Sequence, residues 1–270
     1  MSVINTNINS IKINNALAKN QTEMTMTMES LSTGSRVNRS SDDAAGIAIK
    51  ENMTAQINGF NAAIRNSNDA ISMLQTTDGA LSETTSMLQR MRELSVLSLN
   101  DTYSTAQKTA LSTEFAALRD QIGSIATTTQ WNGISPISAG STFNFQIGAN
   151  AGDSLSVIVS GQTLAILGLS GLTIDSYANA ASAMSFVALA LSSINTTRST
   201  IGAAINRLNY VIDNLSTGAQ NAYESRSKIA DTDYAVATSN LARQQIINQA
   251  GTAMLAQANQ MPSMVLALLK

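Results

Sequence analysis

The chain has 270 residues, a formal net charge of −2, and neither cysteine nor histidine. These absences exclude disulfides, thiolate or imidazole catalysis and metal sites with Cys or His ligands. The low charged fraction of 13% has no basic cluster, which argues against nucleic acid as a partner, and the absence of a run of 18 apolar residues argues against a membrane-spanning helix.

Residues 1–33 are predicted to form an amphipathic helix that is rich in Asn and Thr. A terminal helix gains most of its stability from packing, so we expect this segment to pair with another part of the chain and with other copies of it. Its apolar positions are candidate subunit contacts: Ile4, Ile8, Ile11, Leu17, Met24 and Leu31.

A second helix is predicted to begin near Ala44, after Asp42 and Asp43. Two adjacent carboxylates could bind a metal, but no other carboxylate is spaced to complete an oxygen cage. Capping of the helix N-terminus is therefore the favoured interpretation. We predict no metal site, no cofactor and no catalytic residue.

Residues 57–99 carry apolar side chains at alternating spacings of three and four, with a second apolar stripe beside the first. This pattern predicts a long coiled-coil helix with more than one helical neighbour. A shorter amphipathic helix is expected over residues 104–128.

Residues 142–147 and 154–159 alternate between apolar and polar side chains and predict a β-hairpin within residues 130–163, with its turn at residues 150–153. A short connection rich in Gly and Ser follows, over residues 164–176.

Residues 187–229 repeat an apolar position every seven residues and predict a second long helix, antiparallel to the first. The long helices contain Gly59, Gly79, Gly202 and Gly218, which we interpret as points of close helix approach.

The C-terminal segment, residues 235–269, is separated from that helix by Asp231 and Asp233, of which one is expected to cap the next helix. It is again amphipathic and thinly charged. Its candidate subunit contacts are Ile247, Met254, Leu255, Met261, Val265 and Leu268. The sequence therefore predicts a mainly α protein, a long antiparallel coiled-coil or helical-bundle rod with a small β-hairpin.

Several segments resemble bacterial flagellin, and the resemblance covers nearly the whole chain except residues 165–180. The motifs are INTN (4–7), LSTGSRVN (31–38), DDAAG (42–46), QRMREL (89–94), QWNG (130–133), FQIGAN (145–150), IADTD (229–233) and QAGTAMLAQAN (249–259).

The resemblance implies a structural subunit that polymerises with itself into the hollow helical filament of the bacterial flagellum. It implies a terminal coiled-coil layer, D0, over residues 1–40 and 235–270, and a helical layer, D1, over 41–163 and 177–234. Residues 164–176 would be a short remnant of the variable outer region. It also implies an export chaperone, a cap protein and hook-junction proteins as partners, and export to the cell exterior without a Sec signal peptide.

The resemblance further implies an innate-immune receptor contact, which maps onto Arg90, Leu94 and Glu114. From the residues alone, Arg90 is equally consistent with a solvated pair with Glu93, three residues on.

Two alternatives stay open from the sequence. One is a hook–filament junction protein of the flagellum, and the other is a flagellin-like surface protein that binds a ligand at the hairpin. An enzyme is the weakest interpretation.

Overall fold

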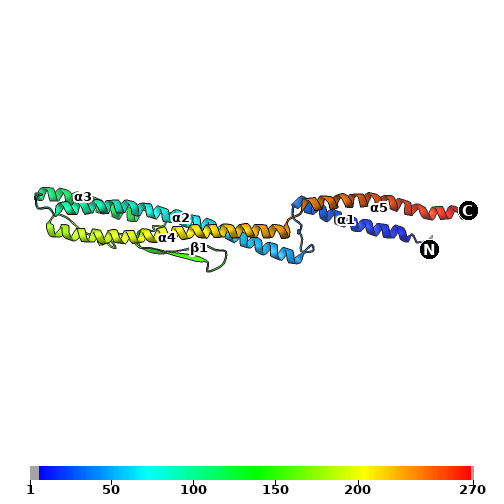
Figure 1. Ribbon diagram of the computed structural model, residues 1–270, viewed down its shortest axis with the longest axis horizontal. Helices are drawn as coiled ribbons and strands as arrows, with labels where there is room; N and C mark the ends of the chain where they lie inside the picture. Colours follow the sequence, from blue (N-terminus) through cyan, green and yellow to red (C-terminus); the bar gives the residue numbers. More distant parts are fainter. Residues whose placement is uncertain (1–5, 269–270) are drawn as a thin grey trace. The chain divides into compact units, whose positions relative to one another are not determined.

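A computed structural model describes residues 6–268, with side chains up to residue 261. Its elements, in chain order, are α1 (Ile8–Thr33), α2 (Ala44–Ser98), α3 (Thr105–Thr128), β1 (Ser141–Gln146), β2 (Ser154–Val159), α4 (Tyr177–Ala230) and α5 (Tyr234–Leu268) (Figure 1). The predicted class, mainly α with one small hairpin, is confirmed.

The chain divides into two compact units, one made of residues up to 55 and from 221, the other of residues 56–220. Helices α2 and α4, of 55 and 54 residues, contribute to both units. Both begin before their heptad repeats do. For α2 the reason is local, because the Asp43 carboxylate accepts a hydrogen bond from the Gly46 amide at 2.8 Å and caps a first stretch that has no strict apolar period.

In the unit that holds the chain ends, α1 and α5 lie side by side and run antiparallel (Figure 1). Gly34 ends α1 with φ of 70°, a left-handed conformation that glycine adopts without strain. The residues that follow α1 bridge to the break between α4 and α5. The Arg36 amide donates to the Ala230 carbonyl at 2.6 Å, and the Thr232 amide donates to the Gly34 carbonyl at 2.9 Å.

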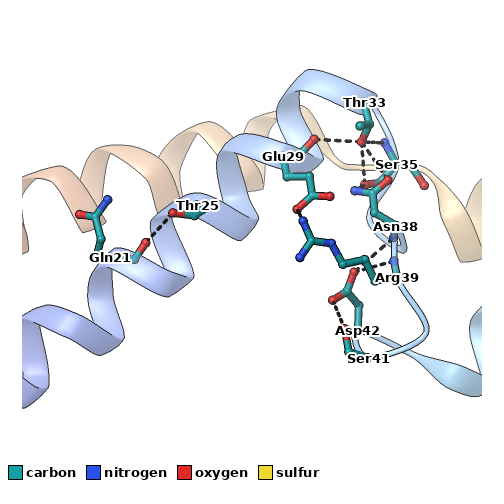
Figure 2. A network of polar contacts seen from close by, with 9 residues as sticks. All are labelled: Gln21, Thr25, Glu29, Thr33, Ser35, Asn38, Arg39, Ser41 and Asp42. Carbon is teal, nitrogen blue, oxygen red and sulfur yellow. Dashed lines mark hydrogen bonds and ion pairs between the residues drawn. The ribbon is translucent and has the colours of Figure 1, made fainter.

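A polar network fixes the connection from α1 to α2 (Figure 2). Arg39 forms an ion pair with Glu29 of α1 at 2.8 Å, and the Arg39 amide donates to the Asp42 carboxylate at 2.9 Å. Asp42 is therefore used by the backbone of its own turn, as a structural rather than a metal-binding carboxylate.

In the other unit, α2 and α4 pack antiparallel around a continuous apolar core, in which most of their heptad positions are buried. Arg198 of α4 pairs with Asp78 of α2 at 2.8 Å. The buried Ser98 hydroxyl, at the end of α2, donates to the Ile174 carbonyl just before α4. The buried heptad side chains include Leu74, Leu81, Leu88, Val187, Ile194, Ile201 and Leu208.

The hairpin pairs β1 with β2 antiparallel, with Ser141 opposite Val159 and Gln146 opposite Ser154. The inward side chains of β2 are buried in the core, together with Leu169 and Ile174 from the connection between the hairpin and α4. That connection has no helix or strand, as predicted, but it closes the core. Its assignment to a variable outer region stays a prediction.

The glycines of the long helices do not share one explanation. A Cβ on Gly59 would lie 2.7 Å from the Ala149 side chain, and one on Gly218 would lie 3.5 Å from the Phe60 ring. A Cβ on Gly79 or Gly202 would meet no atom of the described chain within 4 Å. Close helix approach within the chain is therefore the wrong interpretation for Gly79 and Gly202.

Candidate subunit interface

The two terminal helices meet along an inner seam. Its positions recur at alternating spacings of three and four on both helices, which is the spacing of a coiled coil. Leu17, Met24 and Leu31 of α1 are half-buried here, as is Leu255 of α5, while Ala237 and Ala258 are buried.

Side-chain amides set the register of this pair. Asn20 is 6% exposed and donates to the Gln244 carbonyl at 2.9 Å, while Asn7 donates to the Ala258 carbonyl at 2.7 Å. A polar side chain at a seam position favours the one register in which it finds its partner. Nearby, Gly251 leaves room for Leu17, because a Cβ there would lie 2.7 Å from Leu17 Cδ2.

The outer faces of the same helices carry apolar side chains that nothing in the described chain covers. On α1, Ile8 and Ile11 are 48% and 51% exposed. On α5 the exposed fractions are 47% for Ile247, 60% for Met254 and 50% for Met261. A helix with apolar side chains on two faces has more than one neighbour, so one face pairs within the chain and the other is left for a partner.

Four of the candidate subunit contacts, Leu17, Met24, Leu31 and Leu255, are already half-buried within the single subunit. These four pack in the seam between α1 and α5. Ile4, and the side chains of Val265 and Leu268, lie outside the described residues.

Sequence reasoning missed Ile246 of α5, which is 66% exposed, and Val236, which is 56% exposed. Ile246 lies directly beside the predicted contact Ile247 but off the three-and-four series of predicted contacts, and Val236 precedes the first of them. A search for apolar residues directly beside that series would have found Ile246.

The outer face of α5 is almost free of charge. Arg243 is the one charged residue in its 35 positions. Burying such a surface against a copy of itself removes few charges from water and brings few like charges together. The composition of α5 is therefore suited to burial.

The candidate receptor residues lie on α2 and α3, but they do not form one surface. Arg90 pairs with Glu114 of α3 at 2.9 Å and with Glu93 at 3.1 Å, and these two carboxylates raise the pKa of the Arg90 guanidinium. Leu94 has no exposed surface, because it belongs to the apolar core. Its predicted role as a surface contact is therefore wrong in the folded subunit.

Exposed apolar side chains do lie beside Arg90. A shallow cavity of about 500 Å³ is lined by α2 residues that include Arg90, Glu93, Val96 and Leu97. Val96 is 53% exposed and Leu97 is 38% exposed, whereas Leu94 is buried.

Of the two carboxylates that the sequence singled out between α4 and α5, Asp233 acts as a helix cap. Asp233 accepts hydrogen bonds from the Ala235 and Val236 amides at 2.9 and 3.2 Å and starts α5, as predicted. Among the described residues, no three His, Cys, Asp or Glu side chains gather where a metal ion could bind.

Long antiparallel helices with apolar outer faces and small side chains define a helical structural protein of the self-assembling kind. The family model of the bacterial flagellin N-terminal helical region matches residues 4–142, and that of the bacterial flagellin C-terminal helical region matches residues 184–269. The chain belongs to the bacterial flagellin family.

Individual relatives of the chain are also flagellins or flagellar filament proteins. A flagellin of Halalkalibacterium halodurans is 40% identical over 99% of this chain and 100% of its own length. The flagellar filament core protein flaB2 of Brachyspira hyodysenteriae is 37% identical over 96% of each chain. The crystal structure of Bacillus cereus flagellin covers 56% of this chain and 88% of its own, with 28% identity and a TM-score of 0.52.

The chain is thus a structural subunit of the flagellar filament, an extracellular appendage built by self-polymerisation. Neither the junction-protein nor the ligand-binding alternative is better supported by these relatives.

Proposed function

We propose that the outer faces of α1 and α5 are the surfaces through which copies of this chain join in the filament. The observation that carries this proposal is the exposure of Ile8, Ile11, Ile247, Met254 and Met261 on helices whose other face is already paired. Burial of apolar surface contributes about 25 cal/mol per Å² removed from water, so a repeated contact of this kind is strongly stabilising.

A contact that joins one face of a subunit to a different face of the next, without closing, generates a helical filament. We propose that residues 1–40 and 235–270 form the D0 layer and residues 41–163 and 177–234 the D1 layer. The segment 164–176 would leave the subunit without a large outer domain.

The remaining partners follow from the flagellin family. We propose that an export chaperone, a cap protein and hook-junction proteins bind this chain, and that it leaves the cell without a Sec signal peptide. We propose no catalytic activity, no cofactor, and no nucleic-acid or membrane partner. Although α4 is the one described helix long and apolar enough to cross a membrane, its heptad side chains Val187 and Ile194 are buried in the core.

For an innate-immune receptor we propose a contact centred on Arg90 and Glu114, with the exposed Val96 in the place first assigned to Leu94. The Arg90–Glu114 pair bridges α2 and α3, so it presents a fixed charged patch beside an apolar one.

The experiment that tests the assembly proposal places a charge on the outer face of α5. The variant Met254→Asp should remain a folded helical subunit by circular dichroism but fail to extend seeds under the electron microscope, because an unpaired carboxylate would have to be buried. Met254→Leu is the matched control and should polymerise like the original chain. Filaments of normal length from Met254→Asp would overturn the proposal.

A further inference from the structure

The described methionines range from buried to exposed, with Met24, Met53, Met87 and Met184 in between. Met73 and Met91 are 4% and 0% exposed in the core around α2. Four others have about half of their surface or more exposed, all on α1 and α5: Met26 53%, Met28 51%, Met254 60% and Met261 50%.

Thioethers are the oxidisable sulfur groups of this chain, since it has no cysteine. Peroxide transfers one oxygen to a methionine sulfur: the O–O bond breaks, an S–O bond forms, and water leaves. The product, methionine sulfoxide, is polar and has a strong hydrogen-bond acceptor where an apolar group stood. Reductases that act on methionine sulfoxide reverse the reaction.

We propose that Met26, Met28, Met254 and Met261 are modification sites at which peroxide oxidation of the free subunit blocks its polymerisation. The inference rests on the proposed function, because it takes the outer faces of α1 and α5 to be the surfaces that become buried.

Oxidation of these residues should impair assembly without disturbing the fold of the free subunit. In the free subunit the sulfoxide oxygen is hydrated, so oxidation leaves the fold of the α1–α5 pair intact. On assembly the sulfoxide oxygen would lose its water, and burying a polar oxygen without a hydrogen-bond donor placed to meet it costs free energy. Met73 and Met91 are shielded in the core around α2, so these two side chains are not oxidised under the same conditions.

The proposed oxidation takes place before the subunit assembles. A subunit that meets hydrogen peroxide before assembly is modified and excluded, whereas the same side chains in a finished filament are covered. Oxidation therefore lowers the number of subunits that can polymerise and leaves finished filaments unchanged.

The test treats the full-length subunit with hydrogen peroxide, removes the oxidant with catalase, and measures seeded elongation. Peptide mass spectrometry should find sulfoxide at the four exposed methionines and not at Met91. Elongation should slow on the order of tenfold or more, since each tenfold corresponds to the loss of about one hydrogen bond's worth of free energy. Treatment with methionine sulfoxide reductases should restore it.

The matched variant replaces all four methionines by leucine, a swap of similar volume. It should elongate equally fast before and after peroxide. Unchanged elongation of the oxidised original chain would overturn the inference, and so would equal slowing of the original and the leucine variant, because the damage would then lie elsewhere. Restoration by the reductases keeps the test valid if the leucine variant assembles poorly.

A separate arm oxidises finished filaments. Oxidation of the four methionines at the monomer rate there would contradict the proposed assembly surface itself. If the four methionines oxidise slowly in filaments but oxidised subunits still elongate normally, the oxidation inference is overturned and the proposed assembly surface is not.

Discussion

The side-chain amide of Asn20 donates a hydrogen bond to the backbone carbonyl of Gln244, 2.9 Å away and 224 residues later in the chain. Asn20 is almost fully buried between α1 and α5. Together with the hydrogen bond from Asn7 to the Ala258 carbonyl, this contact ties the beginning of the chain to its end and sets how the two terminal helices are aligned. The alignment decides which side chains reach the outer faces.

Two substitutions of Asn20 should therefore distinguish its contribution to the stability of the subunit from its effect on the alignment of α1 along α5. Asn20→Ala is expected to lower the free energy of unfolding by about 1 kcal/mol, the net contribution of one hydrogen bond. Asn20→Leu is expected to keep or raise stability but to allow α1 to slip along α5, because the polar group that selects the register is gone. Urea denaturation measures the first effect and seeded elongation the second. Loss of stability without loss of elongation for the leucine variant would contradict this role.

The helical glycines should respond in opposite directions. Gly79→Ala and Gly202→Ala are each expected to stabilise the free subunit by up to about 1 kcal/mol, since open space surrounds both positions and alanine favours the helix. Gly251→Leu should destabilise the α1–α5 pair by about 1–3 kcal/mol, because Leu17 occupies that space. Thermal unfolding of the three variants gives the comparison, and a stabilised Gly251→Leu protein would refute the packing described for the seam.

Leu94 and Arg90 should behave as a core residue and a surface residue. Leu94→Ala is expected to cost about 2–5 kcal/mol through the cavity it leaves. Arg90→Ala removes exposed ion pairs, which solvent screens, and should change stability little. In a receptor-binding assay on folded protein, Arg90→Ala should weaken binding and Val96→Asp should do the same. A folded Leu94→Ala subunit with selectively lost binding would contradict the burial of Leu94.

Acid should weaken the start of α4. Asn179 donates to the Asp175 carboxylate at 2.7 Å and Thr173 donates at 3.1 Å, and these hydrogen bonds lower the pKa of Asp175. A carboxylate with a lowered pKa in the folded state stabilises the fold above its ordinary pKa, and this contribution is lost as the pH falls through the lowered value. The stability difference between the original chain and Asp175→Asn should thus shrink as the pH falls below about 4, the ordinary pKa of an aspartate. A difference that grows toward low pH would be inconsistent with the geometry.

Deleting residues 240–270 should leave a largely helical protein that cannot polymerise, because the deletion removes most of α5 and with it both the partner of α1 and one outer face. Circular dichroism should retain the helical signal of α2, α3 and α4. Electron microscopy of seeded samples is the readout, and filaments from the truncated chain would contradict the account.

The sequence predicted most of the fold because its signals are long and periodic. The heptads of residues 187–229, the alternating strands and the caps at Asp43 and Asp233 each have a local physical cause that a single chain displays. The start of α2 was also indicated by its cap, although the stretch from Ala44 lacks a seam.

The site was predicted only in part, because periodicity finds apolar faces without saying which neighbour covers each. Leu17 and Ile8 both lie on apolar stripes of one helix, yet one packs against α5 and the other is exposed. Leu94 illustrates the same limit: a position taken from a resemblance says nothing of burial, which depends on residues brought from α3 and α4. The buried connection residues Leu169 and Ile174 were hidden by their Gly- and Ser-rich surroundings.

The most direct test of the central claim uses the absence of native cysteine. Subunits with one introduced cysteine at Ile247 or at Met254 should react quickly with a maleimide when free and slowly once polymerised. A cysteine at Leu17, in the inner seam, should be slow in both states. If the outer-face cysteines react as fast in filaments as in free subunits, α1 and α5 do not join copies of this chain.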